Sequence, residues 1–343
     1  MNPPVAQSVS QDTPVSETSA PTASTRSQIH LVGGRKGGVG KTFLSRHLAE
    51  YLTQKQQQFS LVEADITIGD VGKVYGGFEG GKITDAVTIS LSDDPRKYSE
   101  PDVIFQQAVE KQCVLVNLPA ETNDALARWM RSVDLLRLCQ KQNIDLYHWF
   151  VTDGCYASIR LLAESIEMLD GKLPHIVIRN EGRLNSKSFA YLDDEPLYQK
   201  IVGSPENSSE ASSENKIPRS PNLVCLRDFP VLGSEEQFYL DKHNLTYEAG
   251  VEAFMTERRW IEAQRVKTFA ERATEVIAQI FTTDLPAFRA KQAEASTADE
   301  ASTEANPSPK SKRPRKGEAV AILPTQRSEP EPPSEPEPPT SAN

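Results

Sequence analysis

Residues 29–54 read IHLVGGRKGGVGKTFLSRHLAEYLTQ. The apolar first four residues are typical of a strand, and the pattern after Lys41 is that of an amphipathic helix. The Gly-rich run at 33–40 lies between them. Because glycine permits positive φ, the backbone N–H groups of such a loop can turn inward at a helix N-terminus and cradle phosphate oxygens. The segment therefore predicts a phosphate-binding loop between a strand and a helix.

The residue types that close this loop indicate the ligand. Lys41 is expected to bridge the β- and γ-phosphates, and the hydroxyl of Thr42 is expected to ligate Mg²⁺. ATP and Mg²⁺ are therefore the expected cofactors. The predicted nucleotide-binding residues of the loop are Gly37, Gly38, Val39, Gly40, Lys41 and Thr42.

Composition limits the class of protein. The chain has 343 residues, of which 38% are hydrophobic and 25% charged, with a formal net charge of −10. No stretch approaches the roughly 20 apolar residues that cross a bilayer, and Met1 is not followed by a signal-like apolar run. The four cysteines show no CxxC or paired spacing, which fits a reducing compartment. We therefore expect a cytoplasmic protein.

Three polar segments divide the chain. Residues 1–27 are rich in Pro, Ser, Thr and Gln and are expected to be a disordered leader. Residues 289–343 lose apolar periodicity, carry a basic run at 310–316 and end in Pro and Glu, so a disordered low-complexity tail is expected. The Ser-rich stretch 204–222 is expected to be a flexible insertion. The remainder of 28–288 predicts a single domain.

Short apolar runs alternate with amphipathic ones along this domain. This alternation predicts an α/β fold with a doubly wound, mostly parallel sheet and helices on both faces, as in P-loop NTPases. The apolar run at 113–116 fits a central strand. The expected strands are 29–32, 60–62, 113–116, 146–151 and 175–178, and the expected helices are 42–54, 103–111, 122–141, 157–169 and one or two within 247–281.

The loop departs from the strict P-loop pattern in a specific way. It has Arg35 where GxxxxGK[ST] requires glycine, and it adds Lys36 before the glycine pair. The resulting sequence, KGGVGKT, resembles the deviant Walker A motif of the ParA/MinD family of ATPases. The resemblance implies that Lys36 reaches the nucleotide of a partner subunit, so that ATP holds a homodimer together. A second ammonium on the triphosphate makes this dependence on the γ-phosphate physically sensible. The alternative is a solvated Lys36.

Two acidic positions follow the second strand. The segment LVEAD at 61–65 is similar to the family's VxxDxD segment, which implies that Asp65 orients the attacking water. Glu63 stands where the first Asp is usual, and its role is left open. The alternative is a pair of acids in a solvated loop.

The third strand carries a further departure. In VNLPAE at 116–121, Asn117 occupies the family's Asp position and is the predicted metal-site residue. An amide adds no negative charge, so hydrolysis is expected to be slow or absent unless Glu121 or Asp65 compensates.

The fourth strand ends in the segment IRNEG, residues 178–182. In the family a polar residue at this strand end often reads the adenine edge, which implies that role for Asn180. A turn-forming Asn before Gly182 is the alternative. Together, the VNLP and VIRNEG segments resemble most the plasmid mobilization and conjugal-transfer branch of the family.

We expect an ATP-binding, dimeric nucleotide switch that acts with DNA or a relaxase-type partner in plasmid partition, positioning or mobilization. A non-hydrolysing nucleotide-binding adaptor is the alternative. An iron–sulfur dimer of the nitrogenase iron protein type is disfavoured, because only Cys155 falls in a plausible loop. Membrane attachment is not expected, because no basic amphipathic helix ends the chain. The candidate DNA contacts are the basic cluster at 310–316 and, in the late helical segment, Arg258, Arg259, Arg265, Lys267 and Arg272.

Overall fold

A computed structural model describes residues 26–65, 70–76, 78–79, 82–83, 86–92, 94–183, 189–203 and 219–304. The predicted leader falls outside these residues up to position 25, the predicted insertion from 204 to 218, and the predicted tail from 305 onward. The basic run at 310–316 therefore lies outside the described residues.

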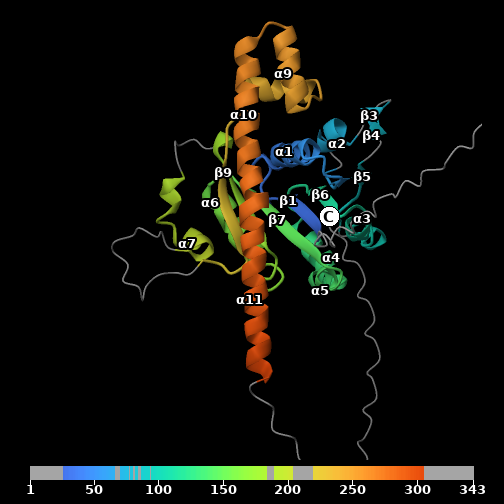
Figure 1. Cartoon of the computed structure of the whole chain (residues 1–343), viewed down its shortest axis with the longest axis vertical. Helices are drawn as coiled ribbons and strands as arrows, with labels where there is room; N and C mark the ends of the chain where they lie inside the picture. The colour runs from blue at the N-terminus through green and yellow to red at the C-terminus, as the bar shows by residue number, and fades with distance from the viewer. Residues whose placement is uncertain are drawn as a thin grey trace, which may run out of the picture. The chain divides into compact units, whose positions relative to one another are not determined.

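A parallel sheet forms the centre of the fold (Figure 1). Within the described residues it has seven strands in the order β5-β2-β6-β1-β7-β8-β9, and every neighbouring pair is parallel. The strands are β1 (Ser27–Gly33), β2 (Ser60–Glu63), β5 (Val87–Thr88), β6 (Cys113–Asn117), β7 (Ile144–Thr152), β8 (His175–Asn180) and β9 (Leu223–Phe229). A separate antiparallel pair is formed by β3 (Phe78–Glu79) and β4 (Lys82–Ile83).

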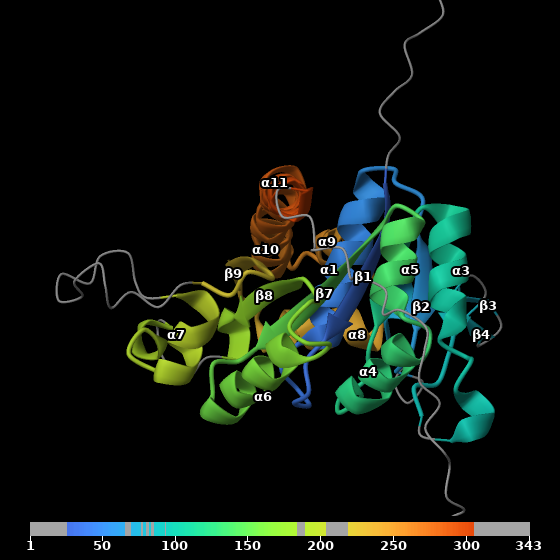
Figure 2. The same cartoon turned by 90° about the horizontal axis from the view of Figure 1, so that it is seen from below.

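Helices cover both faces of this sheet, as Figure 2 shows. One face packs against α1 (Lys41–Gln54) and α10 (Trp260–Gln279). The other face packs against α3 (Asp102–Lys111), α4 (Asn123–Ser132), α5 (Leu135–Lys141) and α6 (Tyr156–Glu167). The predicted doubly wound α/β fold is confirmed.

The central strand β1 explains why both faces are apolar. Ile29 and Leu31 join the apolar cluster of α3 and α4, whereas Val32 joins the cluster of α1 and α10. Successive side chains of a strand point to opposite faces, so a nearly continuous apolar run serves both layers.

The structure corrects the expected elements at several places. The helix expected over 122–141 is two helices, α4 and α5, because Asp134 takes a φ of 48° between them. Among the described residues, four strands are not predicted from the sequence: β3, β4, β5 and β9. Six short helices are not predicted either. They are α2 (Asp70–Tyr75), α7 (Pro196–Val202), α8 (Ser234–Lys242) and the 3-10 turns Pro95–Lys97, Glu181–Arg183 and Ala190–Leu192.

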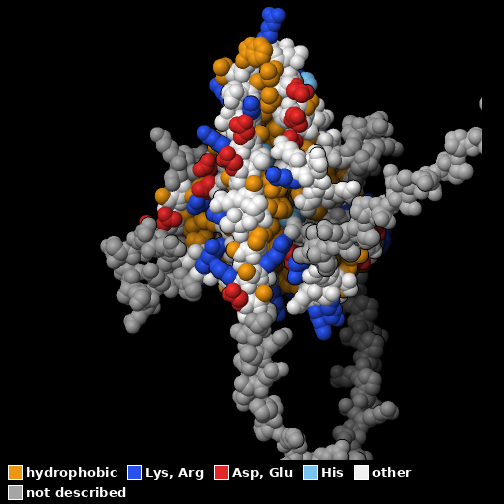
Figure 3. Space-filling model, in the orientation of Figure 1, with side chains coloured by type: hydrophobic (Ala, Val, Ile, Leu, Met, Phe, Trp, Pro, Cys, Tyr) orange, Lys and Arg blue, Asp and Glu red, His pale blue; other side chains and the backbone are white. Residues whose placement is uncertain are grey.

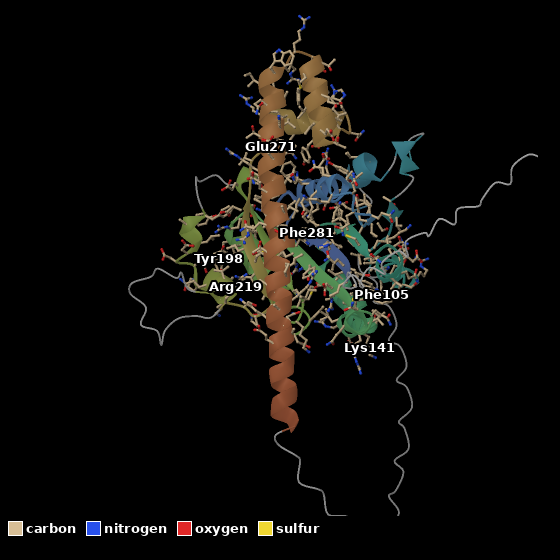
Figure 4. All side chains as sticks on the ribbon, viewed as in Figure 1. Phe105, Lys141, Tyr198, Arg219, Glu271 and Phe281 are labelled. Atoms are coloured by element: carbon tan, nitrogen blue, oxygen red, sulfur yellow. The ribbon has the colours of Figure 1, made fainter. Side chains whose placement is uncertain are left out.

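The late helical segment is anchored to the sheet by aromatic rings. It consists of α9 (Tyr247–Thr256), α10 and a π-helical turn at Ile280–Asp284. Phe281 of that turn lies against the rings of His30, Tyr51 and Trp149, with centroids 5.2 to 6.0 Å apart (Figure 4). This contact fixes the end of α10 over β1 and β7.

The chain separates into two compact units, 1–292 and 293–343. Helix α11 (Leu285–Glu304) extends past residue 289, where the low-complexity tail was expected to begin. The segment is rich in Ala and Glu, which favour helix even without apolar periodicity. None of the described helices is long and apolar enough to span a membrane.

A buried polar network links β7, β8 and α6. Ser165 lies 2.9 Å from Nε2 of His175 and 3.3 Å from Nδ1 of His148, and all three side chains are buried. The other ring nitrogen of His175 donates to the Leu173 carbonyl at 2.7 Å. Burial lowers the pKa of His175 to about 4, against the opposing effect of the Leu173 hydrogen bond. The imidazole is therefore neutral in the folded chain at neutral pH.

We predict that this network makes the fold acid-sensitive. Because the unfolded state protonates His175 at a higher pH, stability is present above about pH 6.5 and is lost as the pH falls toward 4. Protonation of His175 in the unfolded state should by itself lower the free energy of unfolding by about 2 kcal/mol between pH 7 and pH 5. Urea unfolding at both pH values should show a flatter pH dependence in His175→Gln. The surface variant His243→Gln serves as the control and should keep the wild-type slope.

Candidate functional site

Close contacts with strands β7 and β8 leave no room for side chains at two glycines of the phosphate loop. It connects Gly33, the last residue of β1, to Lys41, the first residue of α1. Gly40 takes a φ of 106°, and a Cβ at this position would collide with the amide nitrogen of Asn180. A Cβ on Gly34 would lie 2.9 Å from the Val151 carbonyl oxygen. These positions require glycine, because no side chain fits between the loop and strands β7 and β8.

Lys41 and Thr42 stand at the N-terminus of α1, as the sequence predicts. Lys41 is buried, and its ammonium donates to the carbonyl oxygen of Lys36 at 3.4 Å. Burial lowers its pKa, while the charge of Asp65 acts in the opposite direction. Thr42 is half-buried. The first backbone N–H groups of α1 have no intrahelical partner, and no side chain caps this end. The loop can therefore receive an anion.

Lys36 has partners inside its own chain. Its ammonium donates to the Asp153 carboxylate at 2.5 Å and to the Cys155 sulfur at 3.2 Å. The hydrogen bonds to Asp153 and Cys155 raise the pKa of Lys36. Burial of Asp153 raises its pKa, but the hydrogen bonds from Lys36 and Cys155 and the charge of Lys36 together lower the pKa overall. Lys36 is thus paired within its own chain while its side chain stays 40% exposed.

Asn117 belongs to a buried chain of hydrogen bonds. The Ser45 hydroxyl donates to its Oδ1 at 3.0 Å, and its Nδ2 donates to Oε1 of Glu63 at 2.6 Å. Ser45 is fully buried, and Asn117 and Glu63 are each 1% exposed. The residue predicted to serve the metal thus has both its amide oxygen and its amide nitrogen engaged by protein atoms.

Glu63 organises the backbone that follows β2. Its Oε1 also accepts the N–H of Asp65, and its Oε2 accepts the N–H of Gly72, each at 3.3 Å. Burial raises the pKa of Glu63 to about 7, although the hydrogen bonds from Asn117, Gly72 and Asp65 act to lower it. Asp65 itself is half-buried beside the loop. Glu63 is therefore not an acid of a solvated loop.

Asn180 is placed against the phosphate loop. Its Nδ2 donates to the Val39 carbonyl at 2.8 Å, and its Oδ1 accepts the Gly182 N–H at 3.0 Å. The side chain combines the turn-forming role with a contact to the loop. In this arrangement its amide binds protein atoms, and reading of an adenine edge stays a prediction.

A hollow of about 770 Å³ lies beside the loop residue Arg35, between α4 and α6. Arg35 forms an ion pair with Glu164 of α6 there. Charges of both signs line this hollow, which does not include Lys41 or Thr42. Arg35 is thus the residue that the hollow shares with the loop.

Two residues of this site, Ser45 and Asp153, are not predicted from the sequence, and neither is the contact of Cys155 with Lys36. Ser45 is one helical turn after Thr42, so the three-residue spacing on one helix face could have indicated it. Asp153 follows the last residue of β7, and polar residues at carboxyl ends of parallel strands converge on a site. The Cys155 contact has no such sequence signal.

Comparisons with known proteins gave distant similarities. No family model matches the chain. It is 24% identical over 217 residues to "Protein MobD" of Acidithiobacillus ferrooxidans, covering 59% of this chain and 88% of the relative. Among solved structures, a nucleotide-binding protein in complex with ADP from Archaeoglobus fulgidus has a TM-score of 0.31 and 16% identity, covering 46% of this chain and 67% of that one. A chain of the MinC:MinD cell division protein complex of Aquifex aeolicus has a TM-score of 0.34 and 12% identity, covering 71% and 94%.

We predict that Gly40→Ala destabilises the protein by about 2 kcal/mol or more, because the new Cβ adds backbone strain and meets the Asn180 amide. Gly37→Ala is the matched control, since a Cβ at that position has no neighbour within 4 Å. Urea denaturation of the two variants measures the difference. Equal stability would contradict the close contact between the loop and Asn180.

Proposed function

We propose that the chain binds ATP with Mg²⁺ at the loop 33–42 and acts as a dimeric nucleotide switch with slow hydrolysis. The observation that carries this proposal is the junction of β1 and α1. It combines a Gly-dependent loop, uncapped helix N–H groups and a buried ammonium, that of Lys41. These are the features that bind and neutralise a polyphosphate.

The donor set around the loop suits a hard cation in part. Thr42 supplies a hydroxyl and Asp65 a carboxylate, and oxygen donors are those that Mg²⁺ prefers. Asn117 fits less well, because Ser45 already uses its amide oxygen in a buried position. Mg²⁺ would neutralise phosphate charge, and Thr42 would hold it on the protein side. In this proposal Asp65 orients the attacking water, as the resemblance implies.

Lys36 is proposed to contact the nucleotide of a second protomer. The side chain is 40% exposed despite its bond to Asp153. The Asp153 side chain is 14% exposed, and a triphosphate carries more negative charge than this single carboxylate, so the phosphates can compete with Asp153 for the ammonium. In the free chain Asp153 holds the Lys36 ammonium close to the loop. The phosphates of ATP compete with Asp153 for this ammonium.

A second candidate function is a non-hydrolysing adaptor that uses ATP as a structural ligand. The engagement of Asn117 in a buried network favours it, because the third strand then offers no free acid at the predicted metal position. Steady-state hydrolysis by the wild type, abolished in Asp65→Ala, would exclude this alternative.

For the biological role we propose DNA mobilization, partition or positioning with a relaxase-type or other DNA-bound partner. The distant similarity to a protein named MobD and the VNLP and VIRNEG segments support it. Some of the candidate basic residues are already paired. Arg259 contacts Glu257 and Glu262, and Arg265 contacts Glu236. On the face that Figure 3 shows, acidic and basic side chains are interleaved in the region of α9 and α10. DNA contact would depend on Arg258, Lys267 and Arg272, which form no ion pair with the described residues.

We predict that Lys41→Ala lowers ATP affinity at least about tenfold, because the ammonium nearest the phosphates is removed. Isothermal titration with ATP and Mg²⁺ measures the loss. Lys55→Ala, at an exposed position after α1, is the control. Unchanged affinity in Lys41→Ala would contradict the assignment of the site.

We predict that Lys36→Gln abolishes ATP-dependent dimers while monomers still bind ATP within about threefold of wild type. Asp153→Asn should shift dimer formation to lower protein concentration, because the competing carboxylate is gone. Light scattering with a non-hydrolysable ATP analogue measures both. Dimers that survive in Lys36→Gln would rule out the role of this lysine between subunits.

A further inference from the structure

The hydrogen-bonded chain Ser45–Asn117–Glu63 joins the three elements that position the candidate site. Ser45 lies in α1 directly behind the phosphate loop, Asn117 ends β6, and Glu63 ends β2. Glu63 and Asn117 are register partners across neighbouring strands. The chain therefore lies where the strand ends meet the first turns of α1.

The Asn117 amide links Ser45 to Glu63. Its NH₂ group donates to the Glu63 carboxylate at 2.6 Å, and its Oδ1 accepts the Ser45 hydroxyl at 3.0 Å. A flipped amide would place its oxygen against the Glu63 oxygen, so the carboxylate, which only accepts when ionised, selects the observed orientation. The Ser45 hydroxyl keeps the buried Oδ1 paired, and its loss would leave that oxygen without this donor.

Charge explains the choice of side chains in this pair. An acid at position 117 would contact the Glu63 carboxylate in a site that is 1% exposed, and two such groups cannot both ionise. The resembled family has acids at both positions, but Glu63 is one carbon longer than Asp and reaches side chain 117 directly. The longer acid on β2 and the neutral amide on β6 are therefore compatible only as a pair.

The Glu63 carboxylate also binds the backbone that follows β2. Its oxygens accept the N–H groups of Asp65 and Gly72, which lie on either side of residues 66–69. Asp65 is the acid whose charge acts on Lys41. Glu63 can thus hold Asp65 in position relative to the phosphate loop.

We infer that the role of the acid expected on β6 has been transferred to Glu63 of β2, so that Glu63 is the acid behind the nucleotide, with Ser45 and Asn117 as positioning residues for its carboxylate. This inference rests on the proposed function and names how its site is built. Glu63 then takes the place of Asn117 as the predicted residue of the metal site. It would act by holding Asp65 in position and by adding negative charge near the bound Mg²⁺.

The test is an exchange of charge between the two strands. The variants are Glu63→Gln, Asn117→Asp and the double variant that carries both, which again has a single acid. The readouts are the urea midpoint of unfolding and the ratio of ATP affinity with Mg²⁺ to that with EDTA. We expect Glu63→Gln to lower this ratio at least about tenfold and the double variant to return to within about threefold of wild type. Asn117→Asp should unfold at lower urea than the double variant, or fail to fold where the double variant folds.

Ser45 provides a second, independent arm. Ser45→Ala keeps every charge and should lower the Mg²⁺ ratio, whereas Ser45→Thr keeps the hydroxyl and should restore it. Ser165→Ala, at a buried serine of the histidine network, is the control. An unchanged ratio in Ser45→Ala would overturn the positioning role. A double variant no better than its two single changes combined would overturn the transfer of the acid. If the wild type binds no ATP, the proposed function fails, while the urea midpoints still decide whether the pair is coupled.

Discussion

The close approach of the phosphate loop to the ends of β7 and β8 is the constraint on which this structure depends. The loop must pass beside Val151 and Asn180 with no room for a side chain, and Gly40 meets this demand with a φ of 106°. In return, Asn180 holds the Val39 carbonyl and the loop begins α1 with free N–H groups. The same geometry that packs the sheet therefore leaves these N–H groups available to an anion.

Charges in the candidate site are arranged in two separate groups. On one side of the loop, Lys36 is paired with Asp153 at the end of β7. On the other, Glu63 and Asn117 lie buried behind α1. In the first pair the Lys36 side chain is 40% exposed, whereas in the second the amide oxygen and nitrogen of Asn117 are both hydrogen-bonded to buried side chains. The site thus combines an exposed cation with a buried acid.

Much of the fold was predictable from sequence because strongly apolar runs and glycines act locally. The strands β1, β6, β7 and β8 and the loop follow from such runs, and their placement agrees with expectation. Strand β9 was missed because polar residues precede it and Arg227 and Asp228 interrupt its pattern. The partners of Lys36 and Asn117 could not be predicted, because they are 117 and 72 residues away along the chain. Sequence thus indicated which residues face the site and left open which atoms they bind.

The bond between Glu63 and Asn117 also bears on how this chain could diverge. Changing Asn117 to Asp leaves two touching acids in the buried space, and changing Glu63 to Gln leaves none. Each such change passes through a protein with an impaired buried pair, so positions 63 and 117 should change together in evolution. Homologous chains would then fall into discrete lineages distinguished by which strand bears the acid, with few intermediates between them.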